Sequence, residues 1–236
     1  MNNIPQILYK LTTQQRTTYE GFLWPEPDGE WVETTGDGKL CGPGWIHAYT
    51  DPLLARLLNP IHADIQDTLL WALEWEGRRR DDAGLKVGVT RARLIGPPFP
   101  LPVISSAQEQ RFGIAVVWQM RALWASDAWC AWARTAITEP GPTHSSQFLA
   151  EAAAKETRAV VAGTPRIAAA AAWAVVVVWM QAAPGITRVT AETAALVAGA
   201  AEVVWMAEPH QSIDILTCAQ WAMCENRSLE AIGQYG

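Results

Sequence analysis

The chain has 236 residues, of which half are apolar and 18% are charged, and its net charge is −6. This composition is too apolar for a disordered chain, and the length allows one large domain or two small ones. The negative charge makes nucleic acid an unlikely partner, because proteins that bind it normally present a basic face. The one basic run, at 78–80, is followed at once by Asp81 and Asp82, so we interpret it as a solvated hairpin tip.

The cysteine pattern and the N-terminus favour a cytoplasmic protein. The four cysteines include no C-x-x-C pair, so we expect reduced thiols and no metal site. Residues 1–5 lack the basic and apolar regions of a signal peptide. The segment 167–183 carries no charge but is rich in alanine, and a membrane span needs about 20 strongly apolar residues. We interpret it as a buried helix and expect no membrane span.

The first strand is expected at 7–11, and the glycine- and proline-rich stretch 21–45 favours turns and short strands. A second strand is expected at 45–49. Asp51 has the residue type of an N-cap, and Pro52 suits the first helical position because it has no N–H to leave unbonded. A short helix therefore follows, and Asn59-Pro60 is expected to end it.

A further strand is predicted by the alternation in 69–77. Leu69, Trp71, Leu73 and Trp75 would share the buried face, while the two glutamates at 74 and 76 would lie on the other. One more strand is expected at 86–95. The run Gly96-Pro-Pro-Phe-Pro-Leu-Pro102 is the strongest break in the chain, and we place the boundary between two domains there.

Everything after this break has a helical pattern, with helices expected at 105–135, 145–161, 166–183, 188–207 and 213–232. Ser105 or Ser106 would cap the first of them. The predicted fold class is α+β: a small, mostly antiparallel, β-rich N-terminal half with a short capped helix, followed by an alanine- and tryptophan-rich helical bundle. The predicted domains are residues 1–95 and 105–236, joined by a proline-rich linker at 96–104.

Two pairs of residues are candidates for a catalytic or ligand-binding role. His47 on its strand and His62 beyond the short helix could meet in space, although a lone strand histidine is more often structural. Glu74 and Glu76 lie about 7 Å apart on one strand face, where they could act as acid and base or simply face solvent.

The stretch 40–63, L-C-G-P-G-W-I-H-A-Y-T-D-P-L-L-A-R-L-L-N-P-I-H-A, resembles a signature in an uncharacterised family of phage and bacterial proteins. The pieces that match are Tyr9-Lys10, Gly44 to His47, Asp51 to Leu54, and Lys86-Val87-Gly88. This resemblance covers roughly residues 7–95 and implies a viral or prophage setting, and hence a host-cell cytoplasm, more than a particular reaction.

A fainter resemblance is to small domains of ADP-ribosyltransferase-like fold, in the order of a first strand, a Gly-x-Ile-His segment, a short helix and an apolar strand. The residues nearest to the catalytic set of such enzymes are Lys10, Glu33-Thr34-Thr35, and Glu74-x-Glu76. The resemblance implies that NAD would be the cofactor and that Glu74 or Glu76 would be catalytic. No other cofactor is expected.

Three functional hypotheses follow. The first is a phage-type binding protein that engages a nucleotide-like small molecule or a host protein and could serve as a counter-defence factor. The second is an ADP-ribosyltransferase-like enzyme, and the third is a structural protein that forms a homo-oligomer through its alanine-rich helices. A ligand site is expected beside the second strand, with candidate residues Tyr9, Lys10, Trp45, His47, Tyr49 and His62.

Overall fold

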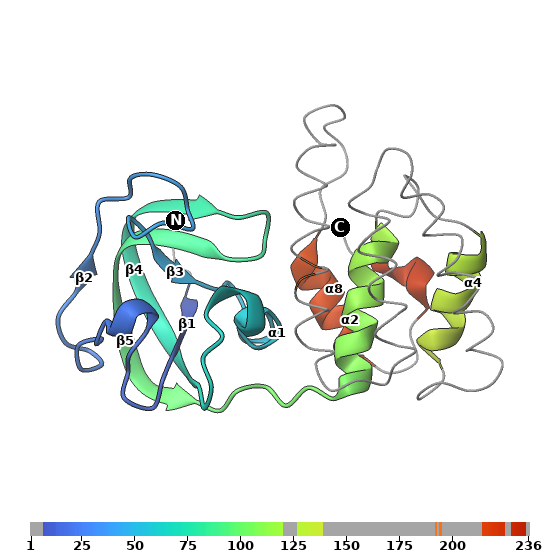
Figure 1. Cartoon of the computed structure of the whole chain (residues 1–236), viewed down its shortest axis with the longest axis horizontal. Helices are drawn as coiled ribbons and strands as arrows, with labels where there is room; N and C mark the ends of the chain where they lie inside the picture. The colour runs from blue at the N-terminus through green and yellow to red at the C-terminus, as the bar shows by residue number, and fades with distance from the viewer. Residues whose placement is uncertain are drawn as a thin grey trace, which may run out of the picture. The chain divides into compact units, whose positions relative to one another are not determined.

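The computed structural model describes residues 7–119, 127–138, 192, 194, 214–224 and 228–234. The chain forms two compact units, Met1–Val103 and Ile104–Gly236, and each is described by itself (Figure 1). The first unit holds an antiparallel sheet and the second holds helices, so the α+β class is confirmed. The helices expected at 145–161 and 166–183, and all but two residues of 188–207, lie outside the described residues.

The sheet of the first unit has five antiparallel strands: β1 Leu8–Thr12, β2 Val32–Glu33, β3 Ile46–Ala48, β4 Leu69–Asp81 and β5 Val87–Phe99. The order is β1-β4-β5-β2, and β3 also pairs with β5. Tyr9 and Tyr49 then exchange two backbone hydrogen bonds of 2.8 Å each, which join the end of β3 to β1. Strands β1, β4, β5 and β3 therefore close into a ring, which Figure 1 shows as a curled sheet.

The inside of this ring is the hydrophobic core of the first unit. The alternation predicted for β4 is confirmed, because Trp71 and Leu73 are buried in the core and Leu69 and Trp75 pack against it. All four strands of the ring contribute, together with one loop tryptophan, and the buried members are Leu8, Trp24, Ile46, Ala48, Trp71, Leu73, Val87, Val89, Ala92 and Leu94. The core positions of β1 also include Lys10, which is the strand partner of Trp71.

Helix α1 spans Pro52–His62 and begins as the sequence predicts. The side chain of Asp51 accepts a hydrogen bond of 2.8 Å from the backbone N–H of Leu53, which is an N-cap. The predicted end at Asn59-Pro60 is wrong, because the helix includes Pro60 and ends at His62. Proline removes one helical hydrogen bond but leaves the later ones possible, and the carbonyl of Asn59 accepts from Ala63.

The predicted linker at 96–104 is also wrong in its first residues, because β5 continues to Phe99. The register of β4 against β5 shifts between Ala72, which faces Ile95, and Leu70, which faces Phe99. The intervening Gly96, Pro97 and Pro98 are accommodated in this irregularity, where no ladder hydrogen bond from proline is needed. Two prolines therefore lie inside a strand rather than after it.

The basic run Arg78–Arg80 lies within β4, so its interpretation as a hairpin tip is wrong. Arg78 lies over the ring of Trp45 and Arg79 over the ring of Trp75, each 5.9 Å from the ring centroid. Arg80 donates to the carbonyl of Gly38. These arginines are therefore held against the sheet by aromatic rings and a loop carbonyl.

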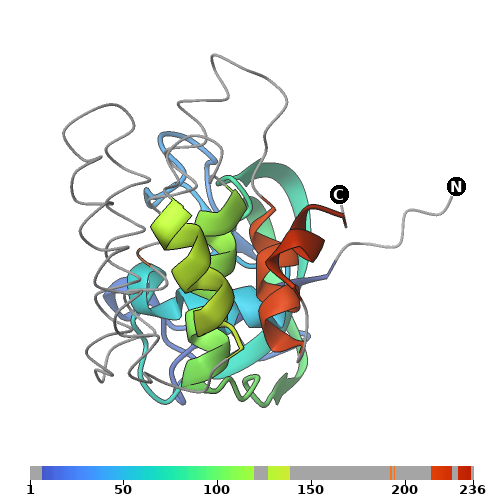
Figure 2. The ribbon, with the colours of Figure 1, turned by 90° about the vertical axis from the view of Figure 1, so that its right-hand side faces the viewer.

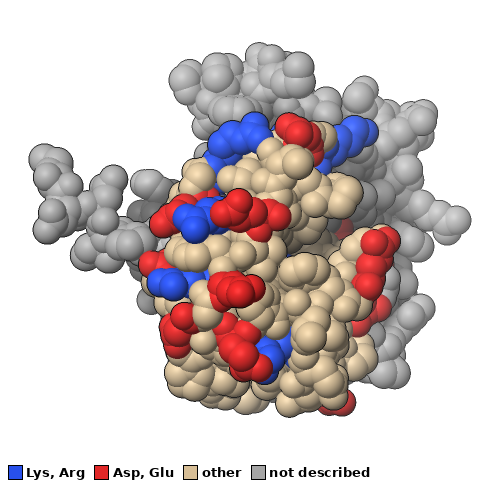
Figure 3. Space-filling model, turned by 90° about the vertical axis from the view of Figure 1, so that its left-hand side faces the viewer, with Lys and Arg blue, Asp and Glu red and all other residues tan. Residues whose placement is uncertain are grey.

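Farther along the hairpin, acidic and basic side chains alternate on the outer face. Arg93 pairs with Glu74 at 2.6 Å, and Arg91 pairs with Glu33 at 2.7 Å and also with Glu76. The ring of Trp31 lies 4.3 Å from the Arg91 guanidinium and 4.8 Å from that of Arg93. Figure 3 shows this mixture of basic and acidic groups on one face of the unit.

The described part of the second unit consists of helices α2 Ser106–Gln119, α4 Asp127–Ala136 and α8 Ile215–Met223, and the 3-10 helix Leu229–Gln234 (Figure 2). Ser105 caps α2 in a reciprocal pair with Gln108, in which each residue's backbone N–H donates to the other's side chain. Trp118, Trp129 and Trp132 are fully buried, as expected for large rings among alanines. No helix within the described ranges is long and apolar enough to cross a membrane.

Candidate functional site

Polar side chains gather around β3, at the seam where the ring of strands closes. We call this group the β3 cluster and define it as Lys10, His47, Tyr49, His62 and Lys86, with Cys41 and Asp82 beside Lys86. Its members come from β1, from β3 and the residue after it, from the end of α1 and from the turn between β4 and β5. Four of them are sequence-predicted site residues. Tyr49 and His62 stack on each other, whereas the Lys10 amine reaches the backbone carbonyl of His47 from the core side of the strand.

Lys10 points into the ring from β1. Its amine donates a hydrogen bond of 2.7 Å to the carbonyl oxygen of His47 and lies 5.6 Å from the ring centroid of Trp24. Burial lowers the pKa of Lys10 to about 8, because the charged amine has lost much of its hydration. A carbonyl and an aromatic face compensate for this loss only in part, since neither carries a full negative charge.

The imidazole of His47 is fixed by the loop before β3. Its Nε2 lies within hydrogen-bond distance of the carbonyl oxygen of Leu40. A carbonyl can only accept, so Nε2 carries the proton and Nδ1 keeps its lone pair while the ring is neutral. Burial lowers the pKa of His47, and the nearby ammonium groups of Lys10 and Lys86 lower it further. The ring is therefore neutral at physiological pH, with Nδ1 as an acceptor.

His62, the last residue of α1, stacks on Tyr49. The ring centroids are 5.8 Å apart with an interplanar angle of 26°, and Nδ1 of His62 lies 3.3 Å from the Tyr49 hydroxyl. Burial, followed by repulsion from the Lys86 ammonium and from a protonated His47, lowers the pKa of His62 to about 3. Burial also raises the pKa of Tyr49. Both rings are thus neutral, and the tyrosine hydroxyl can donate to the imidazole.

Lys86 is the cation that the sequence interpretation left out of the site. It is only 8% exposed, its amine lies 3.2 Å from the sulfur of Cys41, and Asp82 lies 3.7 Å away. Its charge contributes to the lowered pKa of both His47 and His62. The signal was present in the sequence, because Lys86 belongs to the Lys-x-Gly piece of the phage-type signature.

The other two predicted ligand residues have different surroundings. Trp45 is buried, and its side chain together with that of Leu40 covers Gly88, the strand partner of His47, in space that a Cβ would otherwise fill. Trp45 therefore helps to hold the loop that fixes His47. Tyr9 packs its ring edge-on against Phe99, with centroids 6.5 Å apart, and contributes the backbone that joins β1 to β3.

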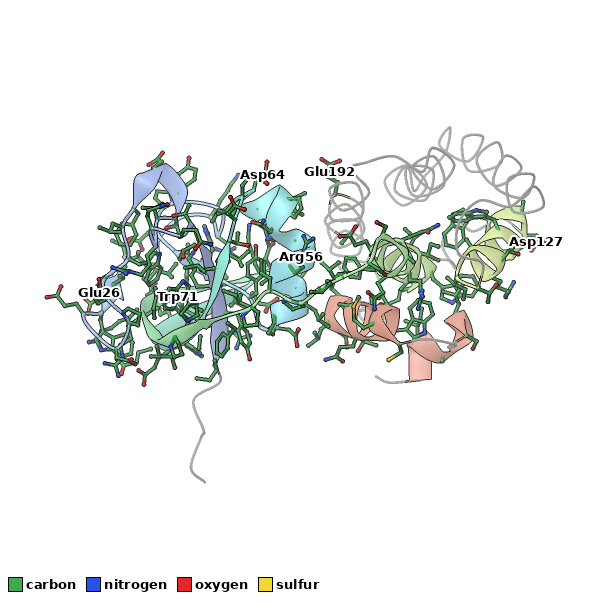
Figure 4. The ribbon with its side chains drawn as sticks, turned by 90° about the horizontal axis from the view of Figure 1, so that it is seen from below. Glu26, Arg56, Asp64, Trp71, Asp127 and Glu192 are labelled. Atoms are coloured by element: carbon green, nitrogen blue, oxygen red, sulfur yellow. The ribbon has the colours of Figure 1, made fainter. Side chains whose placement is uncertain are left out.

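Glu74 and Glu76, the candidate catalytic residues, belong to the outer face of β4. Glu74 accepts from Arg93 and Glu76 from Arg91, so each carboxylate is engaged by an arginine of β5. Lys10, in contrast, occupies a core position opposite Trp71 (Figure 4 labels this tryptophan). Among the described residues, no group of three or more histidine, cysteine, aspartate or glutamate side chains is placed to hold a metal ion.

Comparisons with protein-family models, with curated proteins and with solved structures found no match. The β3 cluster is thus interpreted from its own geometry and charge.

The buried imidazole of His62 predicts a loss of stability in mild acid. Its pKa is about 3 in the folded protein and about 6.5 when unfolded, so below about pH 6.5 only the unfolded state takes up the proton. The stability that the neutral His62 imidazole contributes is complete above pH 6.5 and is lost as the pH falls toward 3. We expect urea denaturation of the whole protein to show a smaller decrease in unfolding free energy between pH 7.5 and 5.0 for His62→Phe than for the wild type.

Phenylalanine keeps a ring against Tyr49 but cannot titrate, which makes it the suitable replacement. Lys10 does not contribute to this difference, because its folded and unfolded pKa values, about 8 and 10.5, both lie above the range tested. Equal pH dependence in the two proteins would show that His62 is not buried as described.

Proposed function

We propose that the chain is a phage-type binding protein that engages a nucleotide-like small molecule at the β3 cluster, in the cytoplasm of a host cell, where it acts as a counter-defence factor. The observation that carries the proposal is the local excess of cationic groups. Two ammonium groups, half-buried Lys10 and buried Lys86, lower the pKa of His47, and Lys86 also lowers that of His62. Among the described residues, Asp82 is the one carboxylate that raises the pKa of His47.

This local charge contrasts with the chain's net charge of −6. The Lys10 amine meets a backbone carbonyl and an aromatic ring rather than a carboxylate. Burying a cation with such partners costs free energy, so Lys10 is more easily understood as a partner for an anionic ligand than as a stabilising feature. Nucleotides combine an anionic phosphate with an apolar, aromatic base. The stacked rings of Tyr49 and His62 are the aromatic part of the β3 cluster, and such rings suit a ligand of this kind.

In this proposal residues 105–236 form an alanine- and tryptophan-rich helical bundle that also provides a surface for self-association. The packing of three buried tryptophans supports the bundle, with Trp129 lying 6.1 Å from Trp118 and 5.8 Å from Trp132 between ring centroids. A host protein as the partner, an assembly role through these helices, and an ADP-ribosyltransferase-like reaction with NAD are the alternatives that the experiment must separate.

The test is a panel of NAD and of cyclic and linear nucleotides, with thermal shift and turnover measured on the full chain. Tight binding without turnover is the expected result. NAD cleavage that is lost in Glu74→Gln or Glu76→Gln would instead establish the transferase-like enzyme. No response to any member of the panel would contradict the proposal and favour a protein partner or an assembly role.

A substitution at Lys10 should separate a binding role from a structural one. We expect Lys10→Met to bind the best nucleotide of the panel at least tenfold more weakly and yet to melt at an equal or higher temperature. The reason is that methionine fills similar space beside Trp24 without the cost of a buried charge. Isothermal titration and a melting curve on the same sample measure both effects.

The matched control is Lys39→Met, which removes the same charge from an exposed lysine in the loop before β3. It should leave both the affinity and the melting temperature unchanged. A large fall in melting temperature in Lys10→Met, with affinity unchanged, would show that Lys10 serves the fold and not the ligand.

A further inference from the structure

Cys41 and Lys86 bring a thiol and a primary amine into direct contact. The Lys86 amine lies 3.2 Å from the Cys41 sulfur, although the two residues are 45 positions apart in the chain. Lys86 is only 8% exposed, whereas Cys41 is exposed. An oxidant from solvent therefore reaches the sulfur directly, and the amine lies behind it on the protein side.

Ordered turns hold both residues. Cys41 lies in the turn in which the N–H of Gly42 donates to the carbonyl of Lys39 at 2.9 Å. Lys86 closes the turn between β4 and β5, where its carbonyl accepts from the N–H of Asp82 at 3.0 Å. The carboxylate of Asp82 also lies 3.7 Å from the Lys86 amine. The buried lysine side chain is thus held against the sulfur by the fold of this unit.

The Lys86 amine can react with an oxidised Cys41. A thiolate that attacks hydrogen peroxide becomes a sulfenic acid, which then condenses with a thiol to a disulfide or with a nitrogen to a sulfenamide. Cys41 is the single cysteine in the sequence of residues 1–103, so its unit contains no second thiol. The nitrogen in contact with the sulfur therefore favours the sulfenamide.

The same pair of residues supplies the protons for both steps. In the first step the Cys41 thiolate attacks one peroxide oxygen, the O–O bond breaks, and the leaving hydroxide takes a proton from the Lys86 ammonium and departs as water. The sulfur is oxidised and the peroxide is reduced. In the second step the neutral Lys86 amine attacks the sulfenic sulfur. An S–N bond forms, the S–O bond breaks, and the hydroxyl leaves with one amine hydrogen as water.

We infer that hydrogen peroxide converts the contact between Cys41 and Lys86 into a covalent sulfenamide, which cross-links the loop before β3 to the start of β5. This inference goes beyond the proposed function and does not depend on nucleotide binding. The cross-link consumes the Lys86 ammonium, whose charge contributes to the lowered pKa of His47 and His62. It also fixes the residue next to Leu40, whose carbonyl holds the His47 ring. Oxidation would thereby change the charge and the mobility of the β3 cluster.

The experiment treats the full chain with a small excess of hydrogen peroxide and compares intact and tryptic masses without reductant. We expect a product about 2 Da lighter than the reduced chain, because two hydrogens are lost. Trypsin should release residues 40–56 joined to residues 81–91, since a cross-linked lysine at position 86 is no longer cleaved. The joined peptides decide the result, because a disulfide elsewhere gives the same intact mass.

Two further readouts follow from the same sample. A thiol reductant should separate the joined peptides, because thiolates attack the sulfur of such bonds. The cross-linked form should melt at least about 5 °C higher than the reduced form, since the bond restricts the unfolded chain.

Cys41→Ser should give no joined peptides, while the other three cysteines remain as a control for general oxidation. Lys86→Arg keeps the positive charge but offers a guanidinium, which is a poor nucleophile, so the reaction should stop at an oxidised Cys41. The wild-type peptides decide the question even if Lys86→Arg does not fold.

Three outcomes overturn the inference: an oxidised Cys41 without joined peptides in the wild type, no reaction at Cys41, or a bond from Cys41 to the exposed Lys39 in place of Lys86. Each of them leaves the proposed function standing, because nucleotide binding is measured on the reduced protein.

Discussion

Replacing Trp71 by alanine is expected to lower the free energy of unfolding by about 4 kcal/mol, the largest effect of any single substitution we propose in the N-terminal unit. Trp71 is 5% exposed and lies near the start of β4, inside the closed ring of strands. Its indole N–H also donates a hydrogen bond of 3.0 Å to the hydroxyl of Thr12, which is completely buried. Alanine would leave a cavity in the core and an unused acceptor on Thr12.

Trp71→Phe is the matched variant, because it keeps an aromatic ring in the core and removes the N–H. We expect it to cost about 1.5 kcal/mol, since most of the buried surface remains. Urea denaturation of the whole protein measures both values, and hydrogen exchange of peptides from β1, β4 and β5 assigns the loss to this unit. A cost below about 1 kcal/mol for Trp71→Ala would contradict a packed core inside the ring.

Gly44→Ala is expected to destabilise the same unit by about 3 kcal/mol and to lower the affinity for any ligand that contacts His47. A Cβ on Gly44 would overlap the carbonyl oxygen of Asp37 and come within 3.0 Å of its backbone nitrogen. Both are backbone atoms, which cannot move aside as a flexible side chain can. The Gly44 carbonyl also accepts a hydrogen bond of 2.7 Å from the N–H of Gly36, so a shift would disturb the loop on both sides.

This glycine precedes Trp45 and β3, so the expected displacement reaches the strand that carries His47. Gly42→Ala is the control in the same loop, because its Cβ would meet only the Lys39 carbonyl, at 3.1 Å. We expect a cost of less than about 1 kcal/mol for the control. Thermal and urea denaturation compare the two variants, and similar stabilities would show that the loop does not approach Gly44 as closely as described.

The sequence by itself determined the fold class and the local secondary-structure signals of the N-terminal unit. Alternation in β4 predicted its buried face, and Asp51-Pro52 predicted the start of α1, because both signals act over a few residues. The ends of helices and strands were harder to predict from the sequence. Pro60 lies inside α1, and Pro97 and Pro98 lie inside β5, since tertiary pairing and a strand irregularity accommodate residues that locally favour a break.

The candidate site was predictable only in part. Lys10, His47, Tyr49 and His62 were singled out from the signature, but their meeting depends on the backbone pair of Tyr9 and Tyr49 that closes the ring. Lys86 comes to the histidines through the pairing of β5 with β3, which no local pattern encodes. The sequence specified which residue types were available beside β3. Only the tertiary structure decided that His47 and His62 would be neutral, because burial and the charge of Lys86 lower the pKa of both imidazoles.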